Sequence, residues 1–224
     1  NISASTVHGQ IHAHASASGA NAISIDIGNG SVLDAGSVYL KAVPPSTIAA
    51  SFDGCDIKLD SESDLYMRHA DVCFGSGKIS VGERADAGGK LFQITDDTVV
   101  HLTDITLSVG GQARSLHNDI YIRPGVTGYV RVFYWLDVKV VDLGANPLMD
   151  AAVHIYRYDD MAERTPYKVP NLGGASYDVT DEVGRTRFQV ASMKVDVLGS
   201  HFVGDYYVNA TYKDLRSEDA SSNG

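Results

Sequence analysis

The chain has 224 residues, of which 44% are hydrophobic and 21% are charged. This supplies apolar material for one large or two ordinary domains and excludes a disordered chain. The formal net charge is −10 at pH 7, and an acidic surface repels nucleic acid and anionic membranes, so neither is expected as a partner. No stretch approaches the roughly 20 apolar residues of a membrane span. The chain begins with Asn1 rather than Met, so we expect a product processed or excised from a longer precursor.

The first half of the chain predicts short strands in close succession. Ile23, Ile25 and Ile27 alternate with polar residues and share one face of an extended segment. The same alternation recurs over residues 37–43, 56–59, 78–81, 91–94, 99–102, 105–109 and 119–122, with Gly, Pro, Asn and Asp between these runs. This spacing is typical of a sandwich, a barrel or a parallel β-helix. We therefore expect an all-β protein whose residues 1–127 form a partial parallel β-helix or a β-sandwich.

The segment 63–74 fits two secondary structures. Ser61 or Ser63 could cap a helix, but Tyr66, Arg68, Ala70 and Val72 alternate along the same stretch. We predict strand here.

Residues 128–142 form the clearest single element, a long run rich in β-branched and aromatic side chains. Pro124 and Gly125 precede it and predict a linker, so we place a domain boundary within residues 124–134. The second domain is expected over residues 128–214, and the small polar residues 215–224 are expected to be a flexible tail.

Ordered motifs in the second half resemble a known family. An alternating strand from Trp135 leads to the turn Gly144-Ala-Asn-Pro147 and to an alternating strand from Ala152. Thr180-Asp-Glu-Val-Gly184 then precedes Phe188, and Gly204-Asp-Tyr-Tyr-Val208 opens a last strand. This pattern resembles the carboxypeptidase regulatory-like, transthyretin-like domain, an immunoglobulin-like β-sandwich. Two departures are a turn one residue longer than the family's Gly-Asn-Pro and an insertion between Tyr156 and Tyr177.

The resemblance implies a stability or spacing module without chemistry of its own, of the kind found at the ends of archaeal and bacterial surface proteins with β-helix-like regions. We therefore expect a non-enzymatic, extracellular structural protein. It would be a subunit of a surface layer or filament that assembles with copies of itself through strand edges and loop contacts. One alternative is a carbohydrate-binding or adhesive module of a surface protein, with glycans as partners. Another is a β-helix polysaccharide lyase or hydrolase. The sequence carries no Gly-x-Ser-x-Gly, His-Glu-x-x-His or Gly-rich phosphate-binding motif.

Several residues are candidates for modification or cross-linking. Cys55 and Cys73 could form a disulfide or remain two buried thiols. Asn1, Asn29 and Asn209 each open an Asn-x-Ser/Thr sequence and are candidate glycosylation sites.

Other residues are candidates for binding. His8, His12 and His14 share one face of an extended strand and could chelate zinc or copper, unless they simply form a polar strand edge. Asp53, Asp56 and Asp60 lie in an acidic stretch that could bind calcium or be a solvated loop. Tyrosines around the insertion could contact a partner or simply decorate a sheet: Tyr156, Tyr158, Tyr167 and Tyr177.

Overall fold

The computed structural model describes residues 2–16, 19–28, 30–61, 63–83, 89–158 and 164–212. The protein is 61% strand and 4% helix, so the all-β prediction is confirmed. The chain divides into two compact units. The first comprises residues Asn1–Phe133 and Ala191–Phe202, and the second comprises Tyr134–Val190 and Val203–Gly224. Across the described ranges, we find no helix with the length and apolarity of a membrane span.

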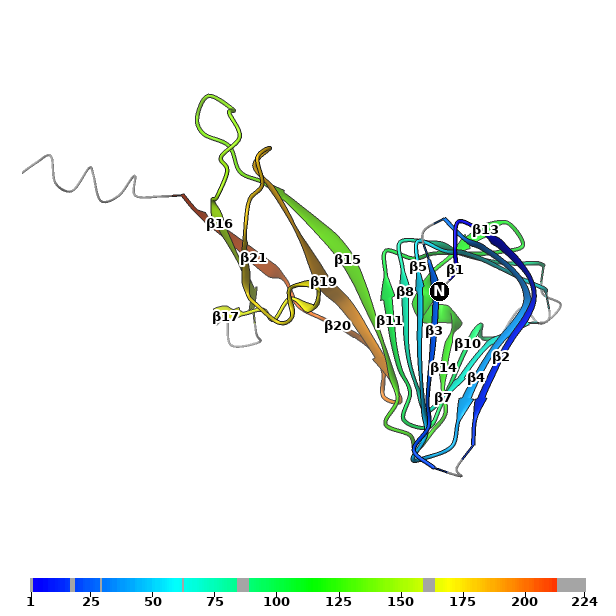
Figure 1. Ribbon diagram of the computed structural model, residues 1–224. Helices are drawn as coiled ribbons and strands as arrows, with labels where there is room; N and C mark the ends of the chain where they lie inside the picture. The colour runs from blue at the N-terminus through cyan, green and yellow to red at the C-terminus, as the bar shows by residue number, and fades with distance from the viewer. Residues whose placement is uncertain are drawn as a thin grey trace, which may run out of the picture. The chain divides into compact units, whose positions relative to one another are not determined.

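The first unit contains a β-solenoid of about four turns, seen in Figure 1 as parallel strands lying side by side. Its first face consists of parallel strands contributed once per turn: β1 (Ile2–Ser3), β3 (Ala22–Gly28), β5 (Thr47–Asp53), β8 (Ala70–Gly75), β11 (Val99–Thr103) and the start of β15 (Tyr129–Lys139). The parallel pairing of these neighbours confirms a β-helix-like first half and excludes a β-sandwich there, because sandwich sheets are antiparallel.

Two further faces share the long strands β2 (Thr6–Ala15) and β4 (Val32–Ala42). Residues 32–35 of β4 pair with β6 (Asp56–Leu59), and residues 38–41 pair with β7 (Leu65–Arg68). The second face continues through β9 (Lys78–Val81), β12 (Thr106–Val109) and the antiparallel β13 (Gln112–Arg114). The third face continues through β10 (Phe92–Thr95) and β14 (Ile120–Ile122), which follows the short 3₁₀ helix η1 (Leu116–Asp119).

The core of the solenoid repeats one pattern on each turn. Alternate residues of each strand point inward, so similar apolar side chains stack from turn to turn. Phe52 of β5 stacks on Phe74 of β8 with ring centroids 5.0 Å apart, and Phe74 meets Phe92 of β10 edge to face at 6.1 Å. The ambiguous segment 63–74 is two strands, β7 and β8, separated by a corner at His69 with a left-handed φ of 48°. The strand prediction for this segment is confirmed.

The second unit has a smaller core beneath an antiparallel sheet. Its central strand β16 (Ala152–Tyr158) pairs with β17 (Arg164–Pro166), β18 (Tyr177–Val179) and β21 (Tyr206–Thr211). Four fully buried residues form its centre: Val153, Ile155, Val169 and Phe188. Phe188 comes from β19 (Arg185–Asp196), and Val169 precedes the 3₁₀ helix η2 (Pro170–Leu172). Strand β19 continues through a hairpin into β20 (Gly199–Phe202).

The division between the units differs in detail from the expected boundary at 127/128. The contacts divide the chain between Phe133 and Tyr134, inside β15, and assign Ala191–Phe202 to the first unit. The physical reason is that β15 pairs with β11 of the solenoid over residues 129–133 and then continues as an unbroken strand. Because the boundary falls inside a strand, no Gly-, Pro- or Ser-rich linker marks its position in the sequence.

Candidate functional site

The third face of the solenoid presents an ordered row of side chains to solvent. The strand register places His12 beside Tyr39, Tyr39 beside Tyr66, Tyr66 beside Gln93, and Gln93 beside Tyr121. A second row, two residues further along each strand, contains His14, Lys41, Arg68 and Thr95 in register. We call these outward positions the ladder face: His12, His14, Tyr39, Lys41, Tyr66, Arg68, Gln93, Thr95 and Tyr121, with Arg123 just beyond β14.

The aromatic row is held in a fixed geometry. The rings of Tyr39 and Tyr66 stack with centroids 4.6 Å apart and planes inclined by 10°, and His12 lies 5.4 Å from Tyr39. The hydroxyl of Thr95 donates a hydrogen bond to the hydroxyl oxygen of Tyr66 at 3.2 Å. Because the two tyrosine rings turn their faces toward each other, they offer solvent their edges and hydroxyl groups. The row is therefore a line of polar groups supported by a stack.

The second row is cationic. Arg68 forms an ion pair through Nε with Asp96, whose Oδ2 also lies 3.6 Å from Nε2 of His69. The backbone N–H of Arg123 donates to the carbonyl of Ile94 at 3.0 Å, which places the exposed Arg123 next in line after Thr95.

Carboxylates are distributed unevenly among the three faces. None of the described strand positions that make up the ladder face is Asp or Glu. In contrast, the outward positions of the second face include Asp34 and Asp56, and those of the first include Asp26 and Asp71. The ladder face is thus locally basic in an acidic protein.

A hollow of about 540 Å³ lies where the ladder face turns into the first face. Ala49 and Val99 are apolar parts of its lining, and Pro44 and Pro45 add to it. His69, Asp71 and Asp97 contribute its ionisable groups. It therefore places hydrogen-bond acceptors beside the cationic row.

The predicted histidine metal site is not assembled. His12 and His14 belong to the ladder face, but the register shifts between Gly9 and Ile11, and His8 lies before this shift, on the second face. There, Nδ1 of His8 is 3.2 Å from Oδ2 of Asp34. Within the described ranges, no three His, Cys, Asp or Glu residues come together in a way that could hold a metal ion.

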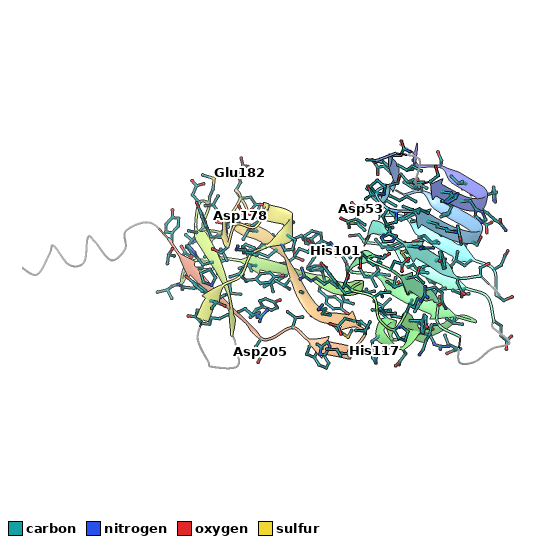
Figure 2. All side chains as sticks on the ribbon, turned by 90° about the horizontal axis from the view of Figure 1, so that it is seen from below. Asp53, His101, His117, Asp178, Glu182 and Asp205 are labelled. Carbon is teal, nitrogen blue, oxygen red and sulfur yellow. The ribbon has the colours of Figure 1, made fainter. Side chains whose placement is uncertain are left out.

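Among the described residues of the acidic stretch, no three carboxylates come together in a way that could hold a metal ion. Asp53 ends β5 and is labelled in Figure 2, and Asp56 begins β6 with its side chain accepting the backbone N–H of Lys78 at 3.1 Å. The carbonyl of Asp60 accepts the N–H of Ser63 at 3.0 Å in the following turn. These three aspartates therefore lie at strand ends and turns of the solenoid.

Both cysteines are free, so the disulfide considered for Cys55 and Cys73 is not formed. Cys55 is buried at a corner, whereas Cys73 is exposed at an outward position of β8. Neighbouring turns thus direct the two thiols to opposite sides of the solenoid wall. The alternative of two buried thiols also fails for Cys73.

Cys73 stands in register with His101 of β11, a residue labelled in Figure 2, but the pair is not set up as nucleophile and base. Neighbouring groups partly shield the Cys73 thiol from water, which raises its pKa, and the nearby Asp71 and Asp53 carboxylates raise it further. Burial lowers the pKa of His101. Both effects favour the neutral forms, whereas an activated thiol needs thiolate character.

The tyrosines around the insertion pack mainly against aromatic neighbours within the second unit. Tyr167 packs on its core and meets Tyr206 edge to face at 4.9 Å. Tyr177 is 52% exposed and stacks on His154 at 5.2 Å. Tyr156 lies 6.1 Å from Tyr207, and the side chain of Tyr158 lies outside the described part of the chain. Tyr177 is the most solvent-accessible of the three that are described.

The candidate glycosylation sites are only partly described. Asn209 is half-buried in β21, beside His154 of β16. Asn1 and Asn29 lie outside the described residues.

A hollow of about 420 Å³ in the second unit is lined by charged residues that already pair with each other. Arg187 donates to both carboxylate oxygens of Asp137 at 2.6 and 3.0 Å, which holds the pKa of Asp137 below its usual range. Asp178, labelled in Figure 2, accepts the hydroxyl of Thr186 at 2.6 Å. These partners occupy groups that a ligand would otherwise use.

The sequence contains a periodic signal for the ladder face, which strand alternation alone does not reveal. Positions 12, 39, 66 and 93 are spaced by 27 residues, and position 121 continues the series. Four of these five positions begin an aromatic-x-basic pair, counting histidine as both: His12/His14, Tyr39/Lys41, Tyr66/Arg68 and Tyr121/Arg123. Comparison with protein-family models, with curated proteins and with solved structures found no match to this chain.

Proposed function

We propose that this protein is a non-enzymatic, extracellular structural module whose solenoid binds a carbohydrate polymer along the ladder face. The observation that carries the proposal is the aromatic-x-basic pair that recurs in register on successive turns. A linear polymer repeats the same chemical groups at regular intervals, and a solenoid face repeats its own groups once per turn. Tyrosine hydroxyls and charged side chains are suitable partners for sugar hydroxyls and substituents.

A purely structural role explains only part of this arrangement. Stacked rings on adjacent turns stabilise a sheet, so the Tyr39–Tyr66 stack needs no ligand. The second row is different, because Lys41 and Arg68 place like charges in register on neighbouring strands. Like charges directly opposite each other destabilise a sheet. Asp96 offsets the charge of Arg68 only. An external anion bound along the row would neutralise the other cations, Lys41 and Arg123.

The second unit supports the structural part of the proposal through its resemblance to a carboxypeptidase regulatory-like sandwich. The carboxylate of Asp142 accepts the N–H groups of Gly144 and Asn146, both at 2.8 Å, in the turn that carries the Asn-Pro motif. The carboxylate of Asp181 accepts those of Val183 and Arg185 at 3.0 and 2.8 Å ahead of Phe188. Both turns lie between strands, which is the arrangement that the proposed resemblance leads us to expect.

Affinity electrophoresis in gels containing a panel of polysaccharides tests the carbohydrate proposal. The double variant Tyr39→Phe/Tyr66→Phe keeps the ring stack and removes only the two hydroxyls. We expect at least one polymer to retard the parent protein and the variant to be retarded less. Tyr177→Phe, at an exposed tyrosine of the second unit, is the matched control and should migrate like the parent. Equal migration of the parent in every gel would refute carbohydrate binding.

A second candidate function is self-assembly into a surface layer or filament, and the β19–β20 hairpin favours it. Strand β20 is the last strand in the order of its sheet, and all four of its residues are exposed. Phe202 is 93% exposed and Leu198, in the hairpin turn, is 83% exposed. Edge strands with exposed apolar side chains are templates for pairing with another chain.

Sedimentation velocity over a range of protein concentrations tests self-assembly. We expect the parent protein to associate and Leu198→Ser/Phe202→Ser to remain monomeric. Leu143→Ser removes a leucine of the second unit that is even more exposed than Leu198, and it should leave association unchanged. A parent protein that is monomeric throughout, with and without calcium, would eliminate this candidate.

A further inference from the structure

We infer that the ladder face selects an acidic polysaccharide, one that carries a carboxylate or sulfate group at regular intervals, over neutral polymers. This inference rests on the proposed carbohydrate binding and adds the chemical class of the ligand. The feature behind it is the second row of the ladder face, which begins with His14 and continues through Lys41, Arg68 and Arg123.

The cations of this row are ordered and only partly neutralised. The Arg68 guanidinium is fixed by its ion pair with Asp96. Lys41 forms no ion pair with any carboxylate in the described ranges, and the same holds for the exposed Arg123. Neighbouring strands of a sheet lie about 4.8 Å apart, so successive turns offer cationic sites along a straight line.

The neighbouring faces show that this charge pattern is particular to the ladder face. On the second face, Lys58 stands in register with Asp34, and Lys78 receives the Asp56 side chain at its backbone N–H. On the first face, Arg131 stands in register with His101, and its guanidinium lies 5.1 Å from the ring centre of Tyr129. The ammonium groups of Lys58 and Lys78 form no ion pair in the described ranges, but an aspartate stands next to each of these lysines. The strand neighbours of Lys41, in contrast, are the basic residues His14 and Arg68.

A regular anionic polymer fits this row better than an acidic segment of another copy of the chain. The overall charge of −10 would attract the row to a second copy, but protein loops present carboxylates irregularly. The row repeats in register at His14, Lys41 and Arg68 on adjacent strands, and Tyr39 and Tyr66 stand in register in the row beside it. A chain of acidic sugars supplies both an anion for one row and hydroxyl groups for the other.

Pairs of polymers that share a sugar backbone and differ in charge test whether the charge of the polymer is recognised. The probes are polygalacturonate against its methyl ester, and dextran sulfate against dextran, with binding measured by affinity electrophoresis and by calorimetry. We expect at least one acidic polymer to bind, its neutral counterpart to bind at least roughly ten-fold more weakly, and binding to weaken as salt increases. Binding to polygalacturonate alone identifies carboxylate as the recognised group, and binding to dextran sulfate alone identifies sulfate.

The double variant Lys41→Gln/Arg123→Gln tests whether the second row is responsible. Each exposed cation contributes only a modest attraction to an anion, so affinity should fall roughly three- to ten-fold. Lys58→Gln/Lys78→Gln removes the same net charge from the second face and should retain the parent affinity. Equal losses in both double variants would mean that overall charge is responsible and would overturn the inference.

The outcomes also distinguish the inference from the proposed function. Binding of neutral polymers as tight as that of acidic ones overturns the acidic selectivity and leaves carbohydrate binding intact. Binding of no polymer, here or across the wider panel, overturns both. Loss of self-association in Lys41→Gln/Arg123→Gln, without any polymer binding, would show that the row serves another copy of the chain.

Discussion

Aromatic packing differs between the two units of the molecule. In the solenoid, Phe74 stacks on Phe52 of the neighbouring turn and also meets Phe92 of the third face. In the second unit, Phe188 is the only phenylalanine among the four fully buried core residues. A solenoid therefore spreads its stability over interfaces between neighbouring turns, whereas a small single core depends on a few side chains and on the turns that frame them. This difference predicts unequal responses to matched substitutions.

The largest expected effect comes from truncating the phenylalanines. Phe188→Ala should destabilise the second unit by about 3–5 kcal/mol, because it leaves a cavity in a core with few other members. Trp135, the only tryptophan, lies in this unit, so its fluorescence during urea unfolding reports the loss. Phe74→Ala is the matched change in the solenoid and should shift the circular dichroism transition while leaving the Trp135 midpoint in place. Parallel shifts of both probes in both variants would mean that the units unfold as one.

A buried hydroxyl in the second unit gives the next largest effect. Thr180 is 2% exposed, and its Oγ1 donates to the carbonyl of Leu148 and accepts the N–H of Ala151 at 3.0 Å. Thr180→Val keeps the shape and leaves both backbone groups without this partner, which should cost about 1–3 kcal/mol in unfolding free energy. Thr180→Ser retains the hydroxyl and should recover most of the loss. If valine and serine behave alike in urea unfolding, the hydroxyl contributes nothing.

A smaller, pH-dependent effect is expected at the β19–β20 hairpin. The pKa of Asp196 is lowered to about 2 by hydrogen bonds. The donors are the side chain of Lys194, the N–H of Leu198 and the side chain of His201. Because the folded pKa lies below the ordinary value of 3.8, this stabilisation is present above pH 4 and is lost as the pH falls toward 2. The stability difference between the parent and Asp196→Asn should therefore shrink over that range. A difference that stays constant from pH 5 to pH 2 would contradict the assignment.

The two thiols should sharpen the comparison without changing stability. In the native protein a small aromatic disulfide reagent should label Cys73 only, because Cys55 is buried. Since partial shielding from water and nearby carboxylates raise the pKa of Cys73, labelling should be slow at neutral pH and faster in alkali. Cys55 should react only when the solenoid opens, which makes it a reporter complementary to Trp135. If fewer than two thiols react in denaturant, the two cysteines are not both free and the disulfide is formed after all.

The sequence predicted local structure better than long-range arrangement. Alternation identified Ile23, Ile25 and Ile27 as one face, and all three pack on the solenoid core, because the period of a strand can be read directly from its residues. It could not distinguish His8 from His12 and His14, since the separating register shift depends on an extra residue in the partner strand β4. The ladder face required knowing that residues 27 apart are neighbours, which is a property of the winding. Composition likewise cannot show that residues 191–202 return to the first unit.

That return has a practical meaning for anyone dividing the gene. A fragment ending at Phe133 would lack β19 and β20, which follow β15 in the order of its sheet, and would expose the side of β15 that β19 covers. A fragment starting at Tyr134 would carry residues 191–202 without the partners with which they cluster. The cleaner excision keeps residues 1–133 and 191–202 in one polypeptide and replaces residues 134–190 with a designed turn. Each unit is thus built from two separate segments of the chain, and neither can be excised as one continuous piece.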